Sequence, residues 1–148
     1  MTTTITRTIE INQKRVDTEK ESFKANSVIA TTTHLSDWIG SKTTEHLVVL
    51  ALNTKNQVIG EYCAFIGSLN TTVAQPREII QFALLSNAAR LILSHNHPSG
   101  NTEPSTSDSK FTDRMTHACD LIGIDLLDHI IVSDDPINYY SFKENHLI

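Results

Sequence analysis

Basic residues are scarce in this chain, and those present do not cluster. The sequence has 12 Lys and Arg against 17 Asp and Glu, which gives a formal net charge of −5. Proteins that bind nucleic acid through phosphate contacts are usually basic, with Lys and Arg gathered in a patch or stripe. No such run is found here, so the charge balance argues against simple duplex binding and gives no support to a nucleic-acid partner.

Cysteine is also scarce, and long apolar runs are missing. The two cysteines, Cys63 and Cys119, lie far apart within apolar sequence patterns. Buried, reduced thiols are a more common outcome for such residues than a disulfide. Met1 is followed by Thr-rich polar sequence, so we expect neither a signal peptide nor a transmembrane span. These features predict a cytoplasmic protein without a membrane partner.

Internal repeats and low-complexity linkers are absent, which favours one folded domain. The length of 148 residues is near the commonest domain size, and a hydrophobic content of 39% is enough for a core. Residues 1–25 differ from the rest, with five basic and four acidic side chains. Alternation over residues 4–11 could form one strand, but we favour a solvated arm or edge strand. We therefore predict an N-terminal arm or edge strand over 1–25 and a folded domain over 26–148.

Hydrophobic periodicity predicts a mixture of helices and strands. Pro76 suits the first position of a helix, and Gly123 suits the residue just beyond one. A continuous apolar segment over 45–52 predicts a strand covered on both faces, with a hairpin turn after it. The expected helices cover 27–40, 76–89 and 105–122, and the expected strands cover 45–52, 57–66, a segment from Leu91 onward, 124–132 and 139–142. This order is typical of an α/β or α+β domain.

The segment Ser94–Asp108 contains the residues that could bind a metal ion. His95 and His97 are two apart, so both point to one face if the preceding strand continues that far. Ser105 and Asp108 have the spacing of an N-cap and its capping partner, which places Asp108 in the first turn of a helix. Two prolines and a glycine bend the intervening loop and turn the Asp toward the imidazoles. Because a catalytic zinc site uses three protein ligands and one water, we predict a metal site rather than two histidines satisfied in a polar turn.

This spacing, His-x-His followed by seven residues and Ser-x-x-Asp, is similar to the JAMM motif of the MPN (JAB domain) metalloprotease family. The segment His95–Gly100 further resembles the form found in RadC-like proteins. The other matching segments are Glu45–Leu50, Asn53–Asn56, Pro76–Glu78 and Leu127–His129, so the resemblance covers roughly residues 27–147. It implies an MPN-type fold, in which helices flank a mixed, partly barrel-like β-sheet.

The resemblance also implies a zinc-dependent hydrolase that cleaves an amide bond in a peptide or isopeptide. The zinc ligands would be His95, His97 and Asp108. The matching Ser105 would donate to the oxyanion, although the sequence alone also allows it to be only an N-cap. Glu45 aligns with the JAMM glutamate that acts as general base, and it opens a buried strand, where a carboxylate without a role is costly. Glu61 on the returning strand is the alternative base, and we favour Glu45.

Two other classes of function stay open at this point. The domain could be a non-catalytic, metal-binding interaction module of DNA-repair or mobile-element machinery, since RadC-like proteins are often labelled DNA repair. It could also be a metal-dependent nuclease, which would usually carry a basic groove. The acidic charge balance gives both nucleic-acid readings less weight than a peptide or protein substrate.

The remaining polar residues receive structural interpretations. We expect the pair Asp128 and His129 to form a buried structural hydrogen bond rather than supply a fourth ligand. Asn96 points away from the His pair in an extended segment and should stabilise a loop, and Asn53 should shape the hairpin turn. The other histidines are expected at the surface or an interface: His34, His46, His117 and His146.

Overall fold

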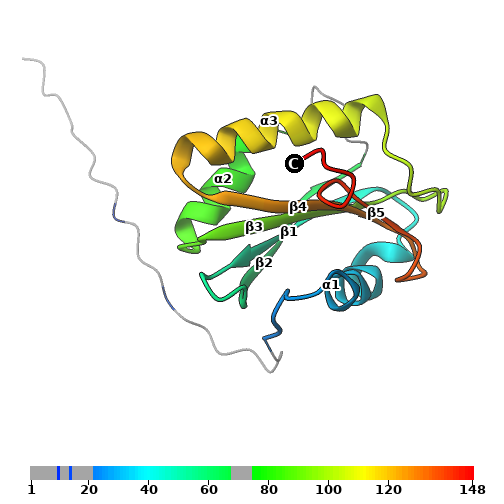
Figure 1. Ribbon diagram of the computed structural model, residues 1–148, viewed down its shortest axis with the longest axis horizontal. Coiled ribbons are helices and arrows are strands. Elements are labelled where there is room, and N and C mark those ends of the chain that lie inside the picture. Colours follow the sequence, from blue (N-terminus) through cyan, green and yellow to red (C-terminus); the bar gives the residue numbers. More distant parts are fainter. Residues whose placement is uncertain (1–9, 11–13, 15–21, 68–74) are drawn as a thin grey trace, which may run out of the picture.

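The computed structural model describes residues 10, 14, 22–67 and 75–148. Their elements are α1 (Val28–Leu35), the π-helix η1 (Ser36–Gly40), β1 (His46–Leu52), β2 (Val58–Ile66), α2 (Pro76–Leu85), β3 (Arg90–Asn96), α3 (Thr106–Ile122), β4 (Asp125–Val132) and β5 (Tyr139–Ser141). The strands form one five-stranded sheet in the order β2-β1-β3-β4-β5. In Figure 1, α2 and α3 lie over one face of the sheet and α1 lies under the other. The expected mixed α/β architecture is confirmed, and in the described residues the sheet does not close into a barrel.

The inner strand β1 pairs antiparallel with both β2 and β3. Six of its seven residues are buried, because helices cover both faces of the sheet. The turn into β2 depends on Asn53, whose Oδ1 accepts hydrogen bonds from the backbone N–H of Lys55 (2.9 Å) and of Gln57 (3.0 Å). This is an Asx-type turn. The predicted hairpin and the turn role of Asn53 are both confirmed.

Strands β3 and β4 are parallel, and α3 is the helix that connects them. The helix begins after a capping box formed by Ser105 and Asp108, and it ends at Gly123 in the left-handed conformation (φ +73°). Both boundaries agree with the sequence prediction. The short loop between β3 and α3 brings the carboxyl end of the strand beside the first turn of the helix.

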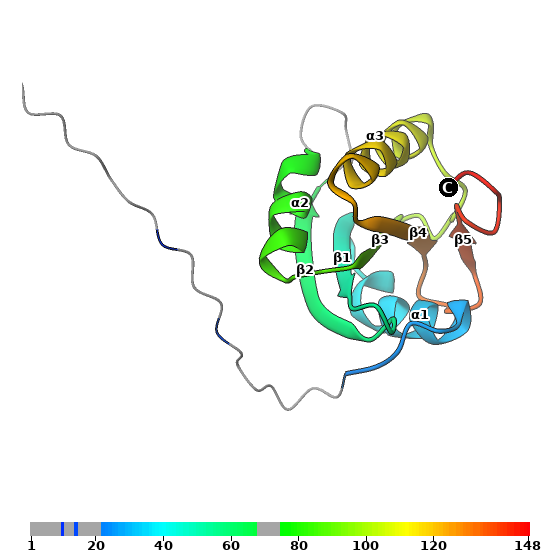
Figure 2. The same cartoon turned by 60° about the vertical axis from the view of Figure 1, so that its left-hand side comes forward.

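Two apolar cores lie on opposite faces of the sheet. The core under α2 and α3 includes Leu93 and Met115, and the core beside α1 includes Leu35 and Ile92. Fully burying one such side chain contributes about 1.5–3 kcal/mol. Figure 2 shows the curved sheet between these helical layers. Because side chains alternate along a strand, the face of each β3 residue decides which layer it meets.

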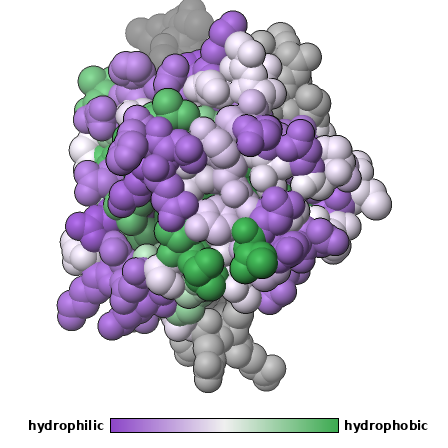
Figure 3. All heavy atoms as spheres, turned by 45° about the vertical axis from the view of Figure 1, so that its right-hand side comes forward, coloured by the Kyte–Doolittle hydropathy of each residue, from purple (hydrophilic) through white to green (hydrophobic). Residues whose placement is uncertain are grey.

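Several smaller expectations can be compared with the structure. Cys119 is buried, Cys63 is half-buried, and both are free thiols. Figure 3 shows a face on which hydrophilic side chains predominate and hydrophobic ones form small separate spots. Among the described residues, no helix has both the length and the apolar character needed to cross a membrane. The strand considered over residues 4–11 lies almost wholly outside the described residues, and the domain boundary near residue 25 stays a prediction.

Candidate metal centre

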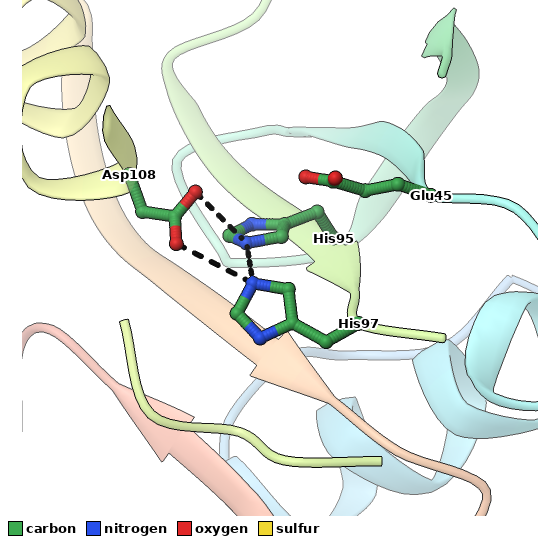
Figure 4. A group of neighbouring side chains, drawn as sticks. All are labelled: Glu45, His95, His97 and Asp108. Carbon is green, nitrogen blue, oxygen red and sulfur yellow. Dashed lines mark hydrogen bonds and ion pairs between the residues drawn. The ribbon is translucent and has the colours of Figure 1, made fainter. Parts of the chain in front are cut away.

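Four side chains from three parts of the chain meet at one end of the sheet. His95 and His97 lie at the end of β3, Asp108 lies in the first turn of α3, and Glu45 directly precedes β1. Each offers one potential ligand atom, and these atoms all lie within 4.8 Å of one another. Figure 4 shows the carboxylates of Asp108 and Glu45 approaching the imidazoles from opposite sides. The structure thus brings together the three proposed ligands and the proposed base.

The spacing of the ligand atoms suits a small divalent cation. His95 Nε2 lies 3.1 Å from His97 Nε2 and 3.3 Å from Asp108 Oδ1, and His97 Nε2 lies 3.4 Å from Asp108 Oδ2. Four-coordinate zinc with bonds of about 2.0–2.1 Å separates its ligand atoms by roughly 3.3 Å. The observed distances are close to that value, so the residues fit a metal of this size.

The hydrogen bonds of His97 show why a cation is favoured here. Its Nδ1 lies 2.6 Å from the carbonyl oxygen of Asn101, which can only accept. Nδ1 therefore donates, and in the neutral ring Nε2 presents a lone pair. That lone pair faces His95 Nε2 and the carboxylate of Asp108. Two imidazole nitrogens and a carboxylate turned toward one point need a positive charge among them, which either a proton on one ring or a bound metal ion supplies.

Electrostatics keep Asp108 in its charged form. Its side chain is only 2% exposed, and burial alone would raise its pKa. In the metal-free protein, protonated rings of His95 and His97 donate to the carboxylate through Nε2–H, which outweighs the effect of burial and holds the pKa of Asp108 well below its usual range. The hydrogen bond with Asp108 in turn raises the pKa of His97, against the opposing effect of burial. A buried carboxylate anion is costly unless a cation balances it, which again favours a metal at this place.

The capping box orients the carboxylate. Asp108 Oδ2 accepts from the backbone N–H of Ser105 at 2.6 Å, and the backbone N–H of Asp108 donates to Ser105 Oγ at 3.1 Å. The same carboxylate faces both imidazoles, so the capping role and the ligand role are compatible. Ser105 Oγ accepts from the backbone N–H of Asp108, and a side-chain hydrogen bond from Ser105 also helps to lower the pKa of the Asp108 carboxyl.

The structure separates the two candidates for the base. Glu45 is half-buried beside the His pair, and its carbonyl accepts from the N–H of Gly67 at 2.8 Å. Glu61 faces α1 instead, where its Oε1 lies 2.6 Å from His34 Nε2. Of these two acids, Glu45 is the one that belongs to the four-residue group. His34, which was expected at the surface or an interface, is half-buried against Glu61.

Asn96 holds the loop that carries Glu45. Its side chain is fully buried, and its Oδ1 accepts from the N–H of His46 at 2.8 Å. Its Nδ2 donates to the carbonyls of Lys42 (3.2 Å) and Thr44 (3.1 Å). The predicted loop-stabilising role is confirmed. The sequence did not indicate which loop, although a polar residue between two ligands and facing away from them was a usable signal.

His129 is a neighbour of the metal centre that sequence reasoning placed only as a structural residue. It is fully buried, and its Nε2 lies 2.8 Å from His95 Nδ1. Burial lowers the pKa of His129 well below its usual value. The expected buried hydrogen bond is confirmed, and its partner is one of the proposed metal ligands. Asp128 bonds instead to Ser141 Oγ (2.6 Å), and burial raises its pKa.

A cavity of about 370 Å³ opens beside His97. It lies between the segment that leads into β1 and the loop after β3, and its lining is residues 40–43, residues 97–100 and Asp134. Ligand sites in proteins commonly enclose about 300–1,000 Å³. The cavity therefore offers room for part of a substrate next to the four-residue group.

Comparisons with known proteins agree with the geometry. The family model described as the RadC-like JAB domain matches residues 24–147. A UPF0758 protein of Streptococcus suis (strain 98HAH33) is 48% identical over 106 residues, covering 72% of this chain and 42% of that protein. A UPF0758 protein of Streptococcus gordonii (strain Challis) is also 48% identical over 106 residues, covering 72% of this chain and 46% of that protein. The chain thus spans less than half the length of these curated relatives.

Proposed function

This chain belongs to the RadC-like JAB domain family, and from that premise we propose that it is a zinc-dependent hydrolase of amide bonds in peptides or isopeptides. The observation that carries the proposal is the grouping of Glu45 with His95, His97 and Asp108 within 4.8 Å. Three nitrogen and oxygen ligands leave a fourth position for water, as catalytic zinc sites do. A carboxylate that is not needed as a ligand then stands beside that position.

The proposed ligands are His95 Nε2, His97 Nε2 and the carboxylate of Asp108. Imidazole and carboxylate together are a common donor set for zinc. A zinc ion held in this way supplies a Lewis acid that lowers the pKa of water to about 7. The ligands come from β3 and α3, whose relative position is set by packing of the helix on the sheet, so the donor set is rigid.

Glu45 is the proposed general base. It accepts a proton from the attacking water as the new carbon–oxygen bond forms, and it delivers that proton to the amine as the carbon–nitrogen bond breaks. A positioned acid–base group of this kind contributes about 10²–10⁴-fold to the rate. The contacts of Asn96 with the preceding loop and the bond from Gly67 support this position of Glu45.

Ser105 is the proposed oxyanion donor. Its hydroxyl is in hydrogen-bond contact with Asp108, one of the proposed ligands, which supports this role. The hydroxyl would donate to the carbonyl oxygen of the substrate as that oxygen becomes negative. One such donor contributes about 10²–10³-fold to turnover.

The test compares Glu45→Gln with Glu61→Gln, because the two acids differ in their distance from the proposed ligands. We expect Glu45→Gln to fold and keep about one zinc per chain but to lose at least ~100-fold in turnover of a peptide substrate. Glu61→Gln should keep both. Zinc content and turnover are measured on the same preparations.

Each other outcome points to a different function. Retained turnover and retained zinc in Glu45→Gln would remove Glu45 as the base. Zinc binding without hydrolysis of any peptide or isopeptide by the wild type would favour the interaction module. Metal-dependent cleavage of DNA would favour the nuclease.

A further inference from the structure

A continuous chain of hydrogen bonds starts at the second ring nitrogen of His95. His95 Nδ1 lies 2.8 Å from His129 Nε2, and His129 Nδ1 lies 2.6 Å from Thr112 Oγ1. Thr112 Oγ1 lies 2.8 Å from the backbone carbonyl oxygen of Asp108. Each of these side chains is at most 1% exposed, so water cannot replace a missing partner. This series of hydrogen bonds connects two proposed ligands, His95 on β3 and Asp108 on α3, through His129 of β4 and Thr112 of α3.

The backbone carbonyl of Asp108, at the far end of this series of hydrogen bonds, determines which atom is the donor in each of them. A carbonyl oxygen only accepts, so Thr112 donates its single hydroxyl hydrogen to Asp108. His129 Nδ1 must then donate to Thr112 Oγ1. In a neutral imidazole one nitrogen donates and the other accepts, so His129 Nε2 accepts from the N–H of His95 Nδ1. His95 Nε2 is left with its lone pair directed at His97 and Asp108.

We propose that His129 is a positioning residue, which holds His95 in the one tautomer that can ligate a metal through Nε2. The inference rests on the proposed metal site. Ligand histidines usually donate their other N–H to a carboxylate, a backbone carbonyl or water. Here the acceptor is an uncharged imidazole, so the tautomer is set without another negative charge beside Asp108 and Glu45. Thr112 transmits this constraint, because it donates to the carbonyl of Asp108 and so must accept from His129 Nδ1.

The ring of His129 is itself held from two sides. β4 pairs with β3 in parallel, with Leu93 opposite His129. The ring of Phe142 stacks on that of His129, with centroids 5.0 Å apart and an interplanar angle of 11°. The backbone N–H of Phe142 also donates to the carbonyl of His129 at 3.0 Å. These contacts hold the acceptor nitrogen in the direction of His95.

Two amide substitutions separate a positioning role from a merely structural one. Gln reaches about as far from the backbone as His Nε2, so in His129→Gln the amide oxygen can accept from His95. Asn reaches only about as far as Nδ1, so His129→Asn keeps a polar group near Thr112 but has no acceptor at His95. The two variants share their chemistry and differ in which end of the ring they replace.

The experiment measures zinc affinity of the full chain by competition with a chelator, together with the absorption spectrum of the cobalt-loaded protein. Thermal unfolding of the metal-free protein reports stability separately. We expect His129→Asn to bind zinc about 10–100-fold more weakly and to change the cobalt spectrum, while His129→Gln stays within about 3-fold of wild type. Wild-type affinity in His129→Asn, or equal losses in both variants that follow their stability, would overturn the proposal.

Two controls make the remaining outcomes decisive. His95→Ala tests the metal site itself, and wild-type zinc binding no tighter than that of His95→Ala removes both the site and this inference. These measurements of metal binding use no substrate. A protein that binds zinc but cleaves no peptide would therefore contradict the proposed hydrolase activity but not the proposed role of His129. If His129→Asn does not fold, Thr112→Val replaces it, with an expected loss in affinity of about 10-fold; unchanged affinity in that variant overturns the proposal.

Discussion

Neighbouring residues on the two faces of β3 make different kinds of contact. His95 points toward α3 and joins a buried group of side chains that bond to one another: His97, Asp108 and His129. Asn96, the next residue, points toward the α1 side, and its side chain bonds to backbone groups at the start of β1 and in the loop before it. Strand alternation is the physical reason, since successive side chains leave a strand on opposite faces.

This contrast indicates that the site has two separable halves. The α3 face contains the charge and the candidate ligands, so changes there should act first on metal binding. The α1 face positions Glu45 through uncharged contacts, so changes there should act on turnover and folding while the metal stays.

The largest effect is expected on the α3 face. His95→Ala, His97→Ala and Asp108→Ala should each reduce zinc from about one ion per chain to almost none, because two ligands rarely suffice for a stable zinc site. Elemental analysis measures this directly. His117→Ala is the matched control, since that histidine is exposed on the same helix. Full zinc occupancy in all three variants would rule out the metal site.

Ser105→Ala should lower turnover by about 10²–10³-fold if its hydroxyl donates to the oxyanion. It should also lower the free energy of unfolding by about 1 kcal/mol, because an N-cap is lost. Ser27→Ala removes the corresponding cap of α1, where Ser27 Oγ accepts from the N–H of Ala30 at 3.2 Å. Denaturant unfolding and turnover are compared for both. Equal turnover in the two variants would show that Ser105 acts only as the N-cap of α3.

Asn96→Leu tests the α1 face. The change leaves one N–H and two carbonyls without their side-chain partner; because these groups are only partly buried and water can reach them, the free energy of unfolding should fall by about 1–3 kcal/mol in total. Turnover should fall by up to about 100-fold, since a displacement of about 1 Å at a catalytic group has that effect. Zinc content should be retained. Loss of zinc in this variant would show that the two faces are not separable.

The smallest effect is expected at Ser94, which faces the same side as Asn96. Within the described residues, its buried hydroxyl has no hydrogen-bond partner. Ser94→Ala should therefore change the free energy of unfolding by no more than about 0.5 kcal/mol and leave zinc content and turnover unchanged. A clear loss of stability would mean that burial on this face matters as much as the contacts of Asn96.

Much of the fold could be predicted because its signals are local. The hairpin follows from an apolar run and from Asn53, whose side chain bonds to residues two and four positions later. The start of α3 follows from the capping box, whose two members are three residues apart. These features depend on neighbouring residues, and so they can be recognised in a bare sequence. Closure of a sheet depends on its distant edges, and in the described residues the strand order β2-β1-β3-β4-β5 leaves this curved sheet open.

The candidate ligand set could be recognised without a structure, because His95, His97 and Asp108 lie within one short segment whose strand, loop and cap bring them together. Which acid faces these ligands depends on how distant strands pack. Glu45 and Glu61 are both upstream, and the packing of β1 and β2 places one beside the His pair and the other beside His34. The same holds for His129 and for the backbone partners of Asn96, which are 34 and at least 50 positions away from the residues they contact. Such contacts depend on strand register and helix packing, which are properties of the whole folded chain.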